Sequence, residues 1–216
     1  MRNKIIPSFA EELHLNNKGY KLIAGLDEVG RGPLAGPVVA AAVILDPQAN
    51  NQYYKELRDS KVLTANQRQR IASLVTETAI DSGIGWVNSE EIDKLGIVRA
   101  TKCAMLRALD NLEIKPDYLL IDALPLPESK LPFNAIISGD AKCRSISAAS
   151  IVAKVARDRY MVNTEDMYPG YGFAQHKGYP SQYHLQRLTE LGPCPIHRRT
   201  FGPVRTIAEQ KQNING

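Results

Sequence analysis

The sequence predicts an α/β domain in which a mixed β-sheet is flanked by helices on both faces. Two apolar runs, residues 20–26 and 37–45, come early in the chain and are separated by a Gly-Arg-Gly-Pro turn, which indicates an antiparallel strand pair. Later apolar runs are short and alternate with longer segments of helical periodicity. A strand pair followed by alternating helices and strands is typical of a mixed sheet with helices on both sides.

Local signals predict the other elements. Thr64 suits the N-cap of a helix that runs to residue 80, and Ser89 is expected to cap a segment whose first turn is acidic. Gly96 is expected to break that helical segment before Pro116. The pattern predicts strands over 82–87, 118–121 and 133–137, and helices over 9–15, 145–167 and 181–191.

We expect one main domain over residues 20–168. It is preceded by a polar lead-in, 1–19, and followed by a C-terminal segment, 169–205, packed on the domain, and by a polar, frayed tail, 206–216. The chain has 216 residues, 44% of them hydrophobic, which is enough for one full core. Its net charge of +4 permits a polyanionic partner without requiring one.

The cysteines and the apolar runs exclude several protein classes. Three widely spaced cysteines without a CxxC pair predict neither a disulfide framework nor a zinc cluster, and the histidines show no HExxH spacing. The N-terminus has no continuous apolar core of a signal peptide, and the longest apolar run is far shorter than the roughly 20 residues of a membrane span. We expect a soluble protein of the reducing cytoplasm.

Four acids follow predicted strands, where α/β proteins gather ligand sites. Two of them form an adjacent pair between apolar runs, and the full set is Asp27, Glu28, Asp122 and Asp140. Carboxylates that converge repel one another, and hard divalent cations take such oxygen ligands and activate water at a phosphodiester. The alternative is that each acid is a turn residue or a helix cap. The acid pair in its apolar setting favours the metal site.

Several residues near these acids suit a nucleic-acid ligand. Gly30, Arg31 and Gly32 directly follow the acid pair, so their backbone could approach a sugar or phosphate closely. Lys61 and Lys154 are candidate phosphate contacts, although a lone lysine is equally well a solvated surface residue.

The C-terminal segment combines basic and aromatic residues. Residues 171–205 hold five Lys or Arg against one acid, interleaved with Tyr and Phe, as a nucleic-acid groove requires. Phe173 and Phe201 are expected to anchor the core, whereas Tyr179 lies in an exposed-looking turn and is the better functional candidate. Ser150 and Lys154 lie four apart on a predicted helix, but their apolar surroundings favour packing over a nucleophilic pair.

Linked motifs over nearly the whole chain closely resemble bacterial ribonuclease HII. In order, they are AGLDEVGRGPLAGPVVAAAVIL, DSKVL, DYLLIDAL, GDAKCRSISAASIVAKVARD and YGFAQHKGYPSQYHLQRLTELGPCPIHRRTFGPV. The resemblance implies a ribonuclease H-like fold with a small helical C-terminal extension. It also implies an endonuclease, dependent on Mg2+ or Mn2+, that cuts RNA in RNA–DNA hybrids and cuts beside ribonucleotides embedded in duplex DNA.

The resemblance assigns roles residue by residue. The family's four metal-binding acids match Asp27, Glu28, Asp122 and Asp140. Its loop that recognises the ribose 2′-hydroxyl matches Gly30, Arg31 and Gly32, and its tyrosine that packs on the neighbouring deoxyribose matches Tyr179.

Asp158 is the alternative to Asp140 as the fourth acid. Asp140 is preferred because Asp158 lies between Arg157 and Arg159 on a helix, where an ion pair explains it. Ala123 stands where glycine is expected in many relatives, and no clamp-binding tail is recognisable.

The sequence therefore predicts a monomeric, metal-dependent endoribonuclease. It is expected to cut on the 5′ side of a ribonucleotide, to leave a 3′-hydroxyl and a 5′-phosphate, and to act in ribonucleotide excision repair, as the resemblance implies. Two other functions stay open: a nuclease of the same superfamily that resolves DNA branches, and a non-catalytic module that binds hybrids.

Overall fold

The computed structural model describes residues 6–214, which form two compact units. One unit comprises the described residues up to Val29 together with Val39–Trp86 and Lys102–Val155, and the other comprises Gly30–Val38, Val87–Thr101 and the described residues from Ala156 onward. Residues 1–5 and 215–216, at the ends of the predicted lead-in and tail, lie outside the described residues. Within 6–214, no helix is long and apolar enough to cross a membrane.

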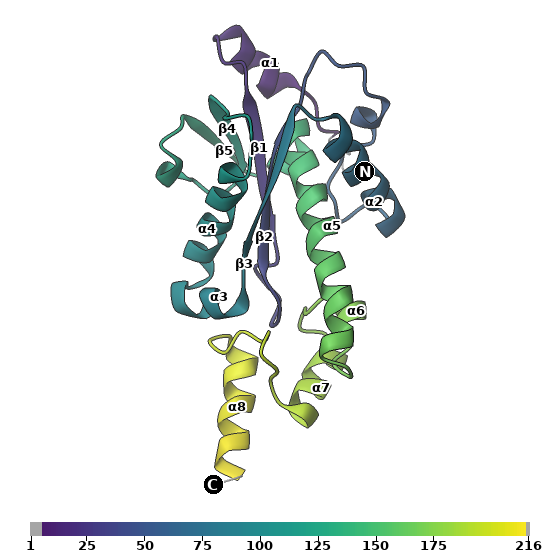
Figure 1. The fold of residues 1–216 in the computed structure, drawn as a ribbon, viewed down its shortest axis with the longest axis vertical. Coiled ribbons are helices and arrows are strands. Elements are labelled where there is room, and N and C mark those ends of the chain that lie inside the picture. The colour runs from purple at the N-terminus through teal and green to yellow at the C-terminus, as the bar shows by residue number, and fades with distance from the viewer. Residues whose placement is uncertain (1–5, 215–216) are drawn as a thin grey trace, which may run out of the picture. The chain divides into compact units, whose positions relative to one another are not determined.

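A five-stranded mixed sheet forms the centre of the first unit (Figure 1). Its strands are β1 (Ile23–Val29), β2 (Val38–Ile44), β3 (Asp81–Val87), β4 (Tyr118–Asp122) and β5 (Phe133–Ile136), in the order β3-β2-β1-β4-β5. β1 pairs with β2 antiparallel and with β4 parallel, and β4 pairs with β5 parallel. The predicted strand pair and mixed sheet are therefore confirmed.

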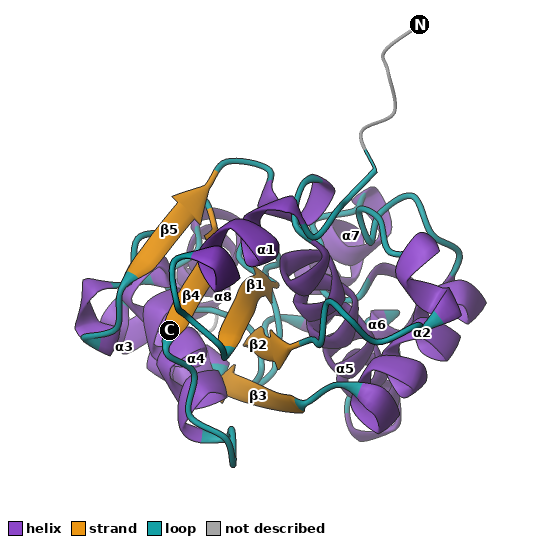
Figure 2. Cartoon of the chain, turned by 90° about the horizontal axis from the view of Figure 1, so that it is seen from above, coloured by secondary structure: helices purple, strands orange, loops and turns teal. Residues whose placement is uncertain are grey.

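Helices lie on both sides of this sheet (Figure 2). The first unit contains α1 (Ala10–Asn17), α2 (Ala65–Thr78) and parts of α4 (Ile97–Asp110) and α5 (Arg144–Met167). Two glycines let helices approach closely: a Cβ on Gly25 would lie 2.1 Å from the carbonyl carbon of Ser145 in α5, and one on Gly85 would lie 2.0 Å from the carbonyl oxygen of Ala104 in α4. Short 3-10 turns occur at Gln52–Lys55 (η1), Pro127–Ser129 (η2) and Gly139–Ala141 (η3).

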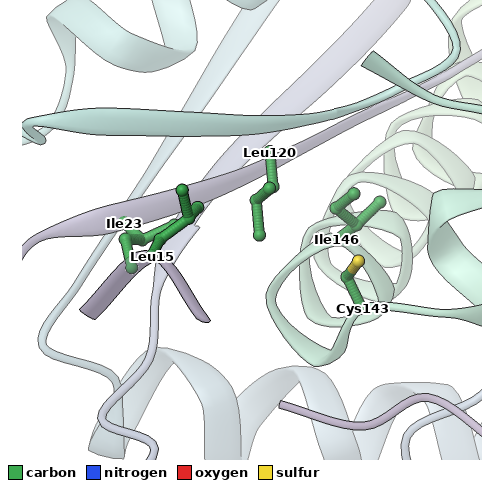
Figure 3. Close-up of a cluster of buried hydrophobic side chains, with 5 residues drawn as sticks. All are labelled: Leu15, Ile23, Leu120, Cys143 and Ile146. Carbon is green, nitrogen blue, oxygen red and sulfur yellow. The ribbon is translucent and has the colours of Figure 1, made fainter. Parts of the chain in front are cut away.

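A compact apolar cluster joins the N-terminal helix to the sheet and to α5 (Figure 3). Leu15 of α1, Ile23 of β1 and Leu120 of β4 meet Cys143 and Ile146 at the start of α5. Burial leaves each of these side chains at most 5% exposed, and such close packing excludes water from the part of the α5 face that the cluster covers.

The caps follow the predicted chemistry with one change. Thr64 caps α2, as expected, and it also forms a reciprocal capping box with Gln67. In α3 (Ser89–Leu95), however, the capping side chain is Asn88, one residue before the predicted cap, because its side chain accepts from the Glu91 amide. Gly96, at φ 75°, ends α3 before α4 begins.

The second unit contains α3, the later part of α5, α6 (Phe173–His176), α7 (Gln182–Leu191) and α8 (Gly202–Ile214). The prediction of a frayed tail is wrong for residues 206–214, because α8 continues through residue 214. Its apolar side chains explain this: Val204 is fully buried with Leu34 and Leu188, and Ile207 packs against the same cluster. Helical spacing of these two residues was the missed signal.

Candidate active site

Two of the predicted site acids lie side by side on neighbouring parallel strands of the first unit. The β1–β4 register pairs Leu26 with Ile121, so the next residues along, Asp27 and Asp122, are level with each other. Side chains two apart on a strand share a face. Asp27 therefore faces α5 as Gly25 does, and Asp122 faces α5 as Leu120 does.

The carboxyl group of Asp27 is buried among other acids. Asp27 is 6% exposed, and one carboxylate oxygen accepts from the Glu28 amide at 2.7 Å. Burial, and then the charges of Glu28 and Asp122, raise the pKa of Asp27 well above its ordinary value, while a hydrogen bond from Ser150 opposes the rise. The sequence placed the acid pair after the first strand, but β1 continues through both residues to Val29.

Asp140 belongs to the same group of acids. Asp122 ends β4, and its carboxylate accepts from the Gly139 amide at 2.7 Å, which ties it to the turn that carries Asp140. Burial, then the charges of Asp122 and Asp59, raise the pKa of Asp140, and the charge of Lys61 opposes this. Lys61 therefore lies within electrostatic range of the predicted site.

Glu28 occupies a different position. The regular β1–β2 pairing extends through Glu28–Ala40 and Val29–Val39, so alternation along β1 directs the Glu28 side chain to the face opposite that of Asp27. Among residues 6–214, no group of three or more His, Cys, Asp and Glu side chains is arranged to hold a metal ion as it stands. The donor set nevertheless suits a hard divalent cation, because the charge of Asp122 destabilises the charged forms of both Asp27 and Asp140, and all three offer carboxylate oxygens.

Two serines extend this group beyond the acids. The hydroxyl oxygens of Ser150 and Ser60 lie 3.1 Å apart, and both residues are buried. Ser150 thereby links Asp27 to the turn that carries Lys61, whose amide donates to Asp59 at 2.9 Å. Ser150 was predicted from the sequence only to pack within its helix, so its contact with Asp27 is an addition to the predicted site. Lys154 lies one helical turn further along α5 and is half-buried.

In the second unit, two buried arginines hold the loop that contains the Gly-Arg-Gly motif. Arg198 donates to the carbonyl oxygens of Gly30 at 2.6 Å, Arg31 at 3.0 Å and Gly36 at 2.9 and 3.0 Å. Arg157 donates to the carbonyls of Ala35 at 3.2 Å and Pro37 at 2.9 Å. In these hydrogen bonds the acceptors are backbone carbonyls rather than carboxylates. Neither arginine was predicted from the sequence to hold this loop.

The two glycines of the motif differ sharply in their surroundings. Gly30 has φ 94°, and a Cβ there would lie 2.4 Å from Nε of Arg157 and 2.7 Å from the carbonyl oxygen of Pro37. Gly32 is exposed, has no left-handed backbone conformation, and a Cβ there would meet nothing within 4 Å. Gly30 is thus required by the protein's own packing, whereas the free protein does not require glycine at position 32.

Tyr179 lies in a turn that is connected to this loop. Its side chain is 38% exposed, and the Arg157 guanidinium lies 5.7 Å from its ring centroid, within the range of a cation–π contact. The carbonyl of Gly178 accepts from the Leu34 amide at 2.8 Å, which joins the turn to the loop. Phe173 is fully buried and Phe201 packs against an apolar cluster, so the predicted core role of both is confirmed.

The two candidates for the fourth acid have different neighbours. The charge of Asp122 raises the pKa of Asp140, whereas Asp158 lies beside Arg157, whose pKa its charge raises against the larger effect of burial. These neighbours favour Asp140 as a partner of Asp122.

The chain is similar to known proteins over most of its length. The family model described as Ribonuclease HII matches residues 24–204. A ribonuclease HII of Dehalococcoides mccartyi is 49% identical over 203 residues, which cover 94% of this chain and 96% of the relative. The solved structure of ribonuclease H2 from Pyrococcus horikoshii OT3 has a TM-score of 0.75 at 29% identity and covers 89% of this chain and 99% of its own. Bst-RNase HIII, solved in complex with Mn2+, shares the fold with a TM-score of 0.62 at 17% identity, over 89% of this chain and 70% of its own.

Proposed function

The chain belongs to the ribonuclease HII family and is a ribonuclease H, an endonuclease that acts on RNA–DNA hybrids, and from this premise we propose how its residues do so. We propose that it hydrolyses the RNA strand of hybrids and also cuts duplex DNA on the 5′ side of an embedded ribonucleotide, leaving a 3′-hydroxyl and a 5′-phosphate. In this proposal it acts as a monomer in the cytoplasm.

The family depends on divalent metal, and we infer that Mg2+ or Mn2+ serves here. Asp27, Asp122 and Asp140 would supply carboxylate oxygens from the α5 face of the sheet. Glu28 is included as a ligand because of the family resemblance alone, since alternation along β1 directs its side chain to the opposite face. Bound metal would supply an activated water and charge stabilisation at the phosphodiester. The mutual repulsion of the acids supports this inference, because a dication would offset the cost of burying Asp27 in its charged form.

Recognition of ribose is assigned to the second unit. The backbone of Gly30, Arg31 and Gly32 would contact the 2′-hydroxyl, the mark that distinguishes RNA from DNA, and Tyr179 would pack on the neighbouring deoxyribose. The support is that Gly32 is exposed with open space where a side chain would be, so a sugar can approach the backbone there. Only one residue separates Glu28 from Gly30, so the metal site and the sugar-reading loop are joined through Val29.

Charged side chains would hold the phosphates during hydrolysis. Lys61 lies within electrostatic range of Asp140, and Lys154 lies one helical turn beyond Ser150, the contact of Asp27. Their ammonium groups would neutralise the scissile and neighbouring phosphates, while Ser150 keeps Asp27 oriented by donating to its carboxylate. The single observation that carries the proposal is the level position of Asp27 and Asp122, to which Asp140 is joined through the Gly139 amide.

The test is cleavage of duplex DNA that carries one ribonucleotide, with Mg2+ and separately with Mn2+. Asp122→Asn is expected to lower the rate at least about a hundredfold, since the metal supplies several kcal/mol of stabilisation. Asp158→Asn is the matched control and is expected to cut normally. Metal-induced thermal stabilisation, followed without substrate, should disappear in Asp122→Asn and persist in Asp158→Asn. Loss of cutting in the Asp158 variant, with Asp140→Asn active, would exchange the assignments of the two acids.

The same assay separates the two other functions. A branch-resolving nuclease predicts cutting of four-way junctions that contain no ribose, and a binding module predicts retention of hybrids without cleavage by the wild-type protein. A wild-type protein that leaves the embedded ribonucleotide intact with both metals refutes cutting beside single ribonucleotides. Glu28→Gln then tests whether Glu28 is a metal ligand. If the metal stabilises this variant as much as it stabilises the wild-type protein, the Glu28 carboxylate is not a ligand.

A further inference from the structure

A chain of hydrogen bonds through two buried histidines ends at the backbone of Tyr179. The Cys194 amide donates to Nδ1 of His197 at 3.0 Å, Nε2 of His197 lies 3.1 Å from Nε2 of His184, and Nδ1 of His184 lies 2.9 Å from the carbonyl oxygen of Tyr179. His184 and His197 are 0% and 1% exposed. All of these residues belong to the second unit.

The partners fix the tautomer of each ring. Nδ1 of His197 accepts from an amide, so in the neutral ring its Nε2 carries the proton and donates to His184. Nε2 of His184 therefore accepts, which leaves the proton on its Nδ1, facing the carbonyl oxygen of Tyr179. Every donor then meets an acceptor, and the hydrogen bonds run in one direction, from Cys194 to Tyr179.

The surroundings keep both rings neutral. Burial lowers the pKa of His184 to about 4, and burial together with the positive charge of a protonated His184 lowers the pKa of His197 to about 3. A third histidine, His176, stacks on His184 with ring centroids 4.3 Å apart, and Phe173 meets His184 edge-on at 5.6 Å. A proton on Nδ1 of His197 would face the Cys194 N–H, and a proton on Nε2 of His184 would face the N–H of His197. The series of hydrogen bonds therefore persists only while both rings are neutral.

We propose that His184 is a positioning residue for Tyr179 and that His197 acts through it by fixing the His184 tautomer. This inference rests on the proposed function, in which Tyr179 packs on the substrate sugar. The carbonyl of Tyr179 also accepts from the Ser181 amide at 2.8 Å, so two donors fix the backbone from which the ring projects. The Arg157 guanidinium faces the ring itself, which leaves the backbone and the ring separately held.

Simple core filling would not require this arrangement. An apolar ring at each position would fill the space beside Phe173 without the cost of burying polar nitrogens. The histidines instead offer a side-chain donor to the Tyr179 carbonyl, beside the Ser181 amide, and an acceptor for the Cys194 amide. A fixed turn matters for a stacking residue, because a misplacement of about 1 Å can cost a hundredfold in rate.

Two substitutions at His184 distinguish the role of Nδ1 from that of Nε2. The amide of asparagine branches at the same atom as Nδ1, so His184→Asn retains a donor for Tyr179, whereas the longer His184→Gln places its amide near Nε2 and loses that donor. The measurement is kcat/KM on duplex DNA with one ribonucleotide, with thermal melting alongside. Asn is expected to stay within about threefold of wild type, and Gln to fall about tenfold or more.

Combination with Tyr179→Ala decides whether the effect passes through this residue. In that background His184→Gln is expected to lower kcat/KM no further. Equal losses in both backgrounds, or equal losses by Asn and Gln, overturn the inference. If Tyr179→Ala itself leaves kcat/KM unchanged, the proposed role of Tyr179 is wrong and this inference falls with it. A loss with Tyr179→Ala but none with His184→Gln overturns the inference alone.

A second measurement needs neither a variant nor substrate. Nitrogen-15 spectra of the wild-type histidine rings at pH 7 report which ring nitrogen carries the proton. We expect protonated Nδ1 at His184 and protonated Nε2 at His197, as the hydrogen-bond partners require. The opposite tautomer at His184 overturns the inference, because that ring would have no proton to donate to Tyr179.

Discussion

The two buried histidines, His184 and His197, make protein stability depend on pH in a way that can be calculated. In the unfolded chain a histidine has a pKa near 6.5, whereas in the folded protein burial lowers the pKa of His197 to about 3. Below pH 6.5 the unfolded state therefore binds a proton that the folded state does not. The contribution of His197 is fully present above pH 6.5 and is lost as the pH falls towards the folded pKa.

The size of the loss follows from linkage. Between pH 7.5 and pH 5, a histidine with these two pKa values reduces the free energy of unfolding by about 2 kcal/mol. His184, whose folded pKa is lowered to about 4, contributes a similar amount. Asp27 and Asp140 act in the opposite direction, since their raised pKa values favour the folded state on acidification. The wild-type pH profile therefore mixes both effects.

A variant isolates the histidine contribution. His197→Asn keeps an acceptor for the Cys194 amide but does not titrate, so its stability should change about 2 kcal/mol less than that of wild type between pH 7.5 and pH 5. Urea unfolding at the two pH values measures this difference, and the contributions of the acids cancel in it. His14→Asn, at an exposed position on α1, is the control and should follow wild type. A difference below about 0.5 kcal/mol would refute a neutral, buried His197.

Four further substitutions test the loop and a residue with a strained backbone. Gly32→Ala should change stability by less than about 0.5 kcal/mol yet slow cleavage beside a ribonucleotide, whereas Gly30→Ala should cost at least about 2 kcal/mol in urea unfolding, because its Cβ meets Arg157 and the backbone of Pro37. Normal cleavage by the Gly32 variant would contradict sugar reading at that residue. Arg198→Lys should lose about 2 kcal/mol or more, since one ammonium cannot replace a fork that reaches three carbonyls; a native-like melting temperature would contradict this. Ala123→Gly should stabilise the protein by up to about 1 kcal/mol because φ at this position is 51°, and lower stability in urea would refute strain there.

The fold was predictable where local and global preferences agree. The apolar run predicted as the second strand matches the complete burial of β2, and Thr64, predicted as the N-cap of α2, caps that helix. Predictions failed where long-range packing decides. β1 extends through Asp27 and Glu28 because β2 continues to pair with it, and no local sequence pattern predicts that pairing. α8 is helical because Val204 is buried against residues far away in the sequence.

The candidate site divides in the same manner. Acids at strand ends can be predicted from a sequence because both their residue type and their position indicate a ligand site. In the structure, the strand register brings Asp27 level with Asp122. The arginines of the second unit carry no such signal. Arg157 and Arg198 bind backbone carbonyls, and a carbonyl is available at every position, so no particular partner residue can be searched for. Histidines at irregular spacing likewise match no motif.

The two buried arginines give the loop an electrostatic property as well as a shape. Burial lowers the pKa of Arg198 to about 9, and the positive charge of Arg157 adds to this effect, so the two guanidinium groups lie within electrostatic range of each other. Both remain protonated at neutral pH, and the carbonyls that accept their hydrogen bonds are dipoles that do not cancel net charge. The Gly30–Pro37 loop therefore lies over two charges that solvent does not screen. Such a positive potential attracts a polyanion whatever its base sequence, as an enzyme that reads the sugar rather than the base requires.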